Sequence, residues 1–283
     1  MTARLAEISA RLGTVRQLDT VVGAMRGMAA ARAQRSRNLL PAIRTYSEVV
    51  AQSMAQALQL LPEGLPASKP GTRRSGLVVF CAEQGFAGAF SERVLDTLAG
   101  EPAETEIFLI GSRGVAHAAE RGIPSVWTAP MASHVEGLAR LAQRLGEALY
   151  AAIRDRGLTC VELLLPDWTQ QNGLRIERRS LLPLDPRRFA PSPPGQPPIV
   201  NLPAAALVEG LAEEYVHAQL REAVTIAFAA ENEARVSAMA SARSNIERML
   251  GKLSSQERQV RQDSITAEVI ELAGGTRALA GQR

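Results

Sequence analysis

Apolar side chains near the start of the chain recur at the spacing typical of one long helix. Between residues 5 and 29 they are separated by three or four positions: Leu5, Ile8, Leu12, Val15, Leu18, Val22, Met25 and Ala29. Their mean period is about 3.4 residues, below the 3.6 of a straight α-helix. The pattern predicts a helix over residues 3–58 that supercoils left-handedly with a partner helix.

The last stretch of the chain carries a matching pattern, and it contains no proline after Pro203. A heptad seam includes Val236, Met239, Ile246, Leu250, Leu253 and Val260, with Arg243 and Glu257 taking the two places without an apolar residue. This predicts a helix from roughly Ala204 to Arg277, about 110 Å long at 1.5 Å per residue. Such a helix exceeds a compact domain of this size. The domain between the two helices joins their inner ends, so we expect them to run antiparallel as a coiled coil.

The middle of the chain alternates short apolar runs with helical patterns. Prolines and glycines over 62–71 mark a linker, and a proline-rich loop over 183–203 returns the chain to the last helix. Strands are predicted at 76–81, 106–110, 124–128 and 158–165, helices at 87–98, 112–121 and 135–156, and a further strand at 174–180 in a hairpin across 170–173. The alternation predicts an α/β domain with a mainly parallel sheet flanked by helices. The chain thus divides into an N-terminal coiled-coil helix (1–60), the α/β domain with its return loop (61–202) and a C-terminal coiled-coil helix (203–283).

Three glycines, Gly13, Gly23 and Gly27, lie inside the first predicted helix. Each costs up to about 1 kcal/mol relative to alanine there. Close approach to the second helix is the favoured compensation, and freedom of this segment to bend or twist is the alternative. Pro41 is expected to kink the helix.

Charge is unevenly placed along a chain whose net charge is only +3. Residues 1–44 hold eight arginines against two acidic residues: Arg4, Arg11, Arg16, Arg26, Arg32, Arg35, Arg37 and Arg44 against Glu7 and Asp19. A basic helical arm suits an acidic partner, whether nucleic acid, an anionic lipid surface or an acidic protein. A solvated helix face explains the same charges.

Candidate chemistry is sparse. Cys81 and Cys160 lie inside apolar runs and are predicted to be buried core residues. The histidines show no metal-ligand spacing, and His217 is expected to be a solvated residue of the long helix. The loop at 84–90 weakly resembles a phosphate-binding turn, but it lacks the third glycine of the dinucleotide fingerprint and the Lys-Ser/Thr of a P-loop. A tight strand-to-helix turn explains it better, and we expect no catalytic centre and no cofactor.

Several runs, in order along nearly the whole chain, resemble the gamma subunit of F-type ATP synthases. Near the end stands Arg261-Gln262-Asp263-Ser264-Ile265-Thr266-Ala267-Glu268-Val269-Ile270-Glu271-Leu272-Ala273-Gly274-Gly275, and near the start Ala24-Met25-Arg26-Gly27-Met28-Ala29-Ala30-Ala31-Arg32. The shorter matches are Arg44-Thr45-Tyr46, Leu77-Val78-Val79, Gln84-Gly85-Phe86-Ala87-Gly88 and Ile110-Gly111-Ser112-Arg113-Gly114.

The resemblance implies a non-catalytic rotor. In that family the two terminal helices form an antiparallel coiled coil inside a ring of alternating alpha and beta subunits. The α/β domain sits outside, on the c-ring with the epsilon subunit. Met25 and Arg26 would then face a carboxylate-rich loop of the beta subunits. Arg261, Gln262, Thr266 and Glu268 would contact the ring near the end of the shaft. The implied location is the cytoplasmic side of the cell inner membrane, with membrane contact only through the complex.

Two other functions compete with the rotor. A nucleotide-binding α/β enzyme with a helical oligomerisation arm would use the loop at 84–88. A basic coiled-coil adaptor would bind nucleic acid, although the arms lack aromatic residues for base stacking and we expect no nucleic-acid partner. The sequence leaves open whether the complex is the main synthase or a divergent second ATPase of the same type, and whether it moves protons or sodium.

Overall fold

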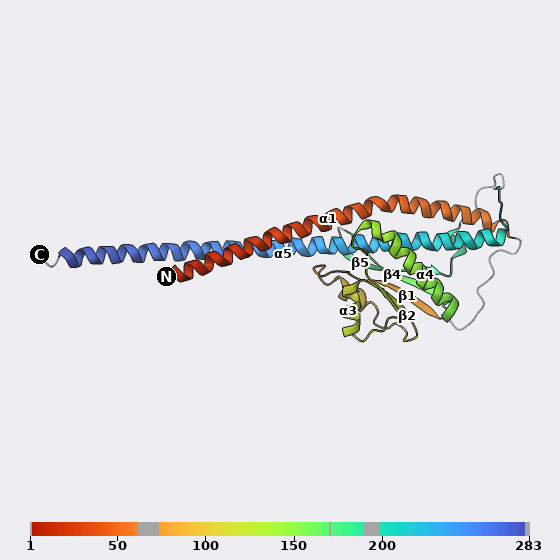
Figure 1. The fold of residues 1–283 in the computed structure, drawn as a ribbon, viewed down its shortest axis with the longest axis horizontal. Coiled ribbons are helices and arrows are strands. Elements are labelled where there is room, and N and C mark those ends of the chain that lie inside the picture. The colour runs from red at the N-terminus through yellow and green to blue at the C-terminus, as the bar shows by residue number, and fades with distance from the viewer. Residues whose placement is uncertain (1, 62–73, 170, 190–198, 281–283) are drawn as a thin grey trace. The chain divides into compact units, whose positions relative to one another are not determined.

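The computed structural model describes residues 2–61, 74–169, 171–189 and 199–280. It divides into two compact units. The arm comprises Met1–Met28 and Val236–Arg283, and the body comprises Ala29–Arg235. Two continuous helices contribute to both units, α1 (Thr2–Leu58) and α5 (Ala204–Ala280) (Figure 1). The predicted helices are confirmed, with their ends within a few residues of the expected positions.

In the arm, α1 and α5 form an antiparallel pair. Leu12 and Val15 of α1 are buried. The two polar positions of the α5 seam both face polar groups of α1. Ser9 Oγ donates to Glu257 Oε1 at 3.2 Å. Farther along α1, Asp19 Oδ1 lies 3.6 Å from Nε of Arg243. Partner numbers in α5 fall as numbers in α1 rise, which is the predicted antiparallel order; the left-handed supercoil stays a prediction.

One seam position was predicted wrongly. Leu18 is 50% exposed, and the following residue, Asp19, turns toward α5 instead. Steps of four and three from Ile8 through Leu12 and Val15 lead to Asp19 rather than to its neighbour. Adjacent residues of a helix point about 100° apart. A one-residue error in the seam therefore moves a side chain from the interface to the surface.

The interpretation of the α1 glycines as points of close helix approach is also wrong. A Cβ atom built on Gly13, Gly23 or Gly27 would meet no described atom within 4 Å outside its own stretch of helix. These glycines lie beside the seam rather than in it, so the second helix does not explain them. The alternative, freedom of this segment to bend or twist, stays a prediction.

Replacing all three of these glycines with alanine should stabilise this part of α1 by about 2 kcal/mol in total, since each helical glycine costs about 0.5–1 kcal/mol relative to alanine. Amide hydrogen exchange over residues 9–27 measures the effect, and it should slow. Unchanged or faster exchange in the triple variant would mean that the backbone leaves the helical conformation at these positions in solution.

The body is built on a five-stranded sheet of order β3-β2-β1-β4-β5. Its strands are β1 (Ser75–Phe80), β2 (Glu106–Ile110), β3 (Trp127–Ala129), β4 (Cys160–Thr169) and β5 (Gly173–Leu182). The first four are parallel, and β5 pairs antiparallel with β4 through the predicted hairpin. The helices are α2 (Phe90–Asp96), α3 (Ser112–Glu120) and α4 (Leu138–Arg156), with 3-10 turns η1 (Val135–Gly137) and η2 (Pro186–Arg188).

Three elements begin three residues later than predicted: α2, β3 and α4, the last preceded by the 3-10 turn η1. Before α2, Phe86 and Gly88 have φ of 64° and 60°, which a right-handed helix does not permit. Before β3, Pro124 has no N–H to donate to a strand ladder. The late starts of α2 and β3 follow from backbone geometry, which the spacing of apolar residues does not reveal.

The sheet is covered on both faces, which explains its almost uninterrupted apolar strands. One face packs against α4 and most of the body part of α5, and the other against α2, α3 and two alanines of α5. Cys81 and Cys160 are buried as predicted, and burial raises the pKa of the Cys81 thiol to about 12. His217 is not the solvated residue expected. It is half-buried, with its ring centroid 6.5 Å from that of Tyr150, because α5 lies against α4 there.

Within the body, α1 and α5 are also linked side by side. Gln219 Nε2 donates to Ser47 Oγ at 2.8 Å, and Arg44 Nε donates to Glu222 Oε1 at 3.0 Å. Near the end of α1, Met54 is buried in an apolar cluster with Phe189 and Tyr215. The helix continues through Pro41, so the proline does not end it, and the kink itself stays a prediction.

Candidate partner-binding surface

The loop after β1 was the candidate for nucleotide binding, but side chains of α5 already form hydrogen bonds with the backbone of this loop. Gln84 N donates to Glu231 Oε1 at 3.5 Å, while the carbonyl oxygens of Gln84 and Gly85 each accept from Arg235 at 3.3 Å. The hollow beside the loop holds about 80 Å³, against 300 Å³ or more for usual ligand pockets. The geometry favours a tight turn that packs on α5.

The described residues offer no candidate metal site either. Across the described ranges, no three histidine, cysteine or acidic side chains are grouped so that they could hold a metal ion. In the same ranges, none of the helices combines the length and apolar character that crossing a membrane requires.

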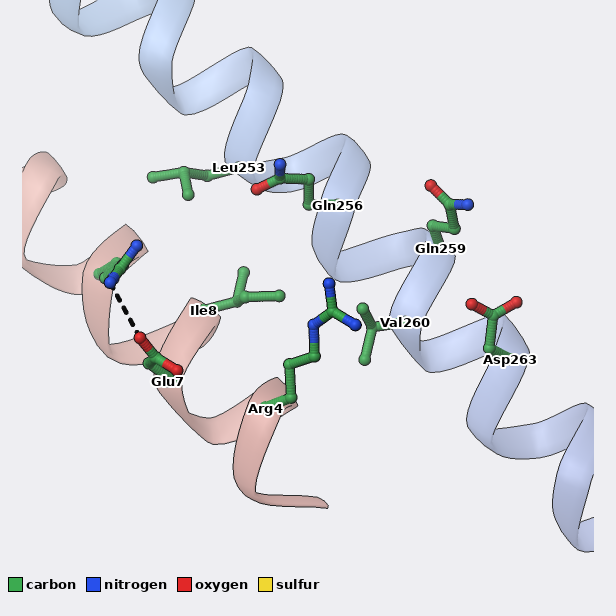
Figure 2. A pocket seen from close by; sticks show the side chains of 9 residues that line it. Arg4, Glu7, Ile8, Leu253, Gln256, Gln259, Val260 and Asp263 are labelled. Carbon is green, nitrogen blue, oxygen red and sulfur yellow. Dashed lines mark ion pairs between the residues drawn. The ribbon is translucent and has the colours of Figure 1, made fainter. Parts of the chain in front are cut away.

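The arm instead carries surfaces suited to binding protein. Figure 2 shows the end of the helical pair, where Ile8 of α1 points toward Leu253 and Val260 of α5. The groove between the helices holds about 360 Å³, and Arg4 and Asp263 are among the residues that line it. The groove lies at the N-terminal end of α1, and α5 continues beyond that end (Figure 1).

Beyond this groove, α5 presents apolar side chains that are more than half exposed. Ile265, Val269 and Ile270 are 56%, 58% and 66% exposed. Ile265 and Val269 are four residues apart and lie on one side of the helix, whereas Ile270 points about 100° away from Val269. Large aliphatic side chains exposed next to each other on this stretch of helix form a candidate surface for a partner.

The four predicted site residues of this segment lie on the same stretch of α5. Gln262, Thr266 and Glu268 are exposed, and so is Arg261, whose Nη2 lies 3.3 Å from Glu257 Oε1. The Thr266 hydroxyl donates to the backbone oxygen of Gln262 at 2.9 Å. All four side chains are thus accessible to a partner next to the apolar positions.

The other two predicted site residues lie on α1, apart from the first four. Met25 is half-buried and Arg26 is exposed. Both lie on the far side of the Asp19–Arg243 pair from Arg261, and Arg243 and Arg261 are separated by roughly 27 Å along α5 at 1.5 Å per residue. The six predicted site residues therefore form two separate surfaces on the arm rather than one site.

Sequence analysis missed an apolar stripe on this second surface. Leu18, Val21 and Met28 are each at least half exposed. With Met25 they follow steps of three, four and three, so they form a helical stripe of their own. That spacing was present in the sequence, but Leu18 and Met25 had been assigned to the seam, and Val21 and Met28 had no assigned role.

Comparison with known proteins places the chain in a family. The sequence model of the family described as ATP synthase matches residues 4–279. A protein named ATP synthase gamma chain from Frankia casuarinae is 26% identical over 304 residues, covering 99% of each chain. One of the same name from Synechococcus sp. (strain JA-2-3B'a(2-13)) is 28% identical over 314 residues, covering 98% of this chain and 100% of the relative.

Solved structures show the same fold. The rotor of the Euglena gracilis mitochondrial ATP synthase contains a chain with a TM-score of 0.65 at 12% identity, covering 94% of this chain and 100% of that one. A chain of the OSCP/F1/c-ring structure from the same organism gives 0.69 at 14% identity, covering 100% and 97%. Similarity therefore extends over both the arm and the body.

Proposed function

Because the chain belongs to the ATP synthase family, in which its relatives are gamma chains, we propose that it is the central rotor shaft of a rotary F-type ATP synthase. The gamma chain is a non-catalytic part of that enzyme. The shaft couples ion flow through the c-ring to conformational cycling of the catalytic alpha/beta ring. The observation that carries the proposal is the antiparallel α1–α5 pair of the arm, in a chain matched by the family over residues 4–279.

The arm has the features that a shaft inside a ring needs. Paired helices resist bending better than one, and the seam between them is fastened by both apolar and polar contacts. The outward faces carry arginines and aliphatic side chains rather than large aromatic rings. Such a surface contacts a partner without an aromatic side chain buried in a partner pocket, so it does not hold the shaft in one orientation.

The two surfaces of the arm are proposed to contact the ring at different heights. Arg26 would approach carboxylates of a beta-subunit loop, where a guanidinium forms charge-assisted hydrogen bonds. Met25 and the exposed stripe beside it would add apolar contact. Arg261, Gln262, Thr266 and Glu268 would contact the ring near the end of α5, next to the aliphatic residues that are exposed there.

The body is proposed to sit on the c-ring with the epsilon subunit. In this arrangement the protein is peripheral, on the cytoplasmic side of the cell inner membrane, and it touches the membrane only through the complex. The transported ion, proton or sodium, is set by other subunits. The alternative of a nucleotide-binding enzyme is not favoured, because the loop it requires donates and accepts its backbone hydrogen bonds within the body.

Site-specific photo-crosslinking tests the proposed contacts. A photoreactive residue in place of Gln262, and another in place of Met25, should each capture alpha or beta subunits in the assembled complex. A control in place of Glu104, an exposed residue of the body, should capture neither. If the arm positions yield no alpha or beta adduct in complexes that contain this chain, the assigned contacts are wrong.

A further inference from the structure

The body contains a buried ion pair that none of the preceding roles uses. Glu231 and Arg235 of α5 are 2% and 6% exposed, and Arg235 Nη2 donates to Glu231 Oε1 at 2.6 Å. Arg235 Nη1 also donates to Oδ1 of Asn232 at 3.3 Å. Removing two charges from water costs several kcal/mol per ion, and well-packed apolar residues often serve stability equally well. The pair therefore calls for an explanation beyond stability.

What distinguishes this pair is that it holds the backbone of another element. Arg235 donates to the carbonyl oxygens of Gln84 and Gly85, both at 3.3 Å. Glu231 Oε1 accepts from Gln84 N at 3.5 Å. Side chains of α5 thus form hydrogen bonds with both an N–H group and carbonyl groups of the loop after β1. We call these four residues, Gln84, Gly85, Glu231 and Arg235, the clamp.

The residue before the clamp fastens the same loop to the rest of the sheet. Glu83 Oε2 accepts from Ser112 N at 3.0 Å and from Met131 N at 2.7 Å, and Glu83 Oε1 accepts from Ser112 Oγ at 2.8 Å. Ser112 follows β2, and Met131 follows β3. One carboxylate therefore ties together the carboxyl ends of three strands, and the adjacent two residues connect that edge to α5.

At this turn of α5, polar contacts add to apolar packing in setting the rotational position of the helix, because Ile226 and Phe228 just before it are buried in the cluster with α4. The residues that face the α2 and α3 side of the core here are Ala230 and Ala234. Methyl groups interdigitate little with a neighbouring surface, so they resist rotation of a helix about its axis weakly. Hydrogen bonds to fixed carbonyl oxygens depend strongly on distance and angle, and they resist such rotation.

We infer that Glu231 and Arg235 are positioning residues that couple the α/β domain to the shaft helix, so that torque on the sheet enters α5 at the clamp. This inference rests on the proposed rotor function. Arg235 is the last residue of the body on α5, and the helix continues without a break into the arm. A rotation that the clamp passes to this turn is therefore carried along a continuous helix.

The two charges of the clamp depend on each other. Burial raises the pKa of the Glu231 carboxyl, while Arg235 and the backbone N–H groups of Glu83 and Gln84 oppose that rise. Without the arginine, the carboxyl would therefore take up a proton more readily. It would then lose its charge-assisted bond to the loop, so a change at Arg235 weakens both halves of the clamp.

The test compares hydrolysis with pumping in the purified complex that contains this chain. In vesicles, Arg235→Met should lower the number of ions pumped for each ATP hydrolysed by roughly threefold or more, a change within the range reported for coupling residues. ATP hydrolysis itself should continue. The matched control is Arg156→Met, which breaks another ion pair of the body, with Glu106 at 2.7 Å, on residues outside the clamp. That control should keep the wild-type ratio.

Two further variants separate coupling from simple stability. In Glu231→Met with Arg235→Met, an apolar pair replaces the charges, so thermal stability and assembly should recover relative to Arg235→Met. The pumping ratio should stay low, because neither methionine can hold the loop backbone. Arg235→Lys should recover part of the ratio, since lysine keeps the charge but lacks the planar fork of donors.

The outcomes distinguish this inference from the proposed function. If the wild-type chain does not assemble with alpha and beta subunits, the rotor function itself is wrong. If the wild-type complex pumps and Arg235→Met keeps its ratio, the rotor function stands and the coupling role is refuted. Recovery of the ratio in the double methionine variant would also refute that role, because the clamp would then contribute stability alone.

Discussion

A variant that ends at Val260 should fold as the full chain does but synthesise ATP at less than roughly a tenth of the normal rate, a change of at least about 1.4 kcal/mol in the effective barrier. Over residues 261–270, where its side chains are described, the removed segment is largely exposed. Its described polar contacts are local, such as Arg261 with Glu257 and Thr266 with Gln262. The loss would therefore report on contacts with the ring, and ATP synthesis by the reconstituted complex measures it.

A finer variant localises the same effect. Ile265→Ser combined with Val269→Ser removes the exposed apolar contact while keeping the length of α5, and it should reproduce part of the loss. Arg258→Ser, at another exposed position of the same helix, is the matched control and should synthesise ATP normally. Synthesis at the full rate by the shortened chain would show that the segment after Val260 does not contact the ring as assigned.

Gly114→Ala should destabilise the body by about 3 kcal/mol, at the upper end of the usual range for overpacking. A Cβ atom on Gly114 would lie 2.0 Å from Cβ of Cys81 and 2.8 Å from its Sγ. Cys81 follows β1 in the buried core and Gly114 belongs to α3, so neither side can move without shifting an element. Chemical denaturation of the isolated chain measures the change.

The matched control for this substitution is Gly210→Ala in α5. Both glycines are helical, but a Cβ atom on Gly210 would meet no described atom within 4 Å outside its own turn of helix. The control should therefore gain up to about 1 kcal/mol from the helix propensity of alanine. If the two variants change stability equally, the close contact between α3 and β1 does not exist in solution.

The long helices could be predicted from sequence because their signals are long and repeated. The absence of proline after Pro203 and the spacing of Met239, Ile246, Leu250 and Leu253 agree over many turns, and the structure follows them. The strands were predicted for a related reason, since fully apolar runs of five or six residues suit a sheet covered on both faces. The order of the strands in the sheet was not predicted.

The errors arose where a pattern does not say which direction a side chain takes. Leu18 and Asp19 are neighbours, and only the paired helix decides which of them faces inward. The glycines of α1 were assigned to close contact, but a glycine adjacent to the seam looks the same in sequence as one inside it. His217 was taken as solvated because nothing in its own helix predicted that α4 would lie beside it.

The clamp shows a second kind of limit. Glu231 and Arg235 are four residues apart, and in sequence they resemble an ordinary exposed ion pair on a helix surface. Their burial depends on the loop at Gln84 and Gly85, about 150 residues earlier in the chain. Only the three-dimensional structure brings that backbone to the helix, so a local pattern could not reveal the contact.

The central claim is that the arm is the shaft of a ring made by other chains. Native mass measurement of the complex purified through a tag on this chain tests it most directly. The account predicts three alpha and three beta subunits for each copy of this chain. A chain that purifies alone, or with alpha and beta subunits in a ratio other than three to three to one, would contradict it.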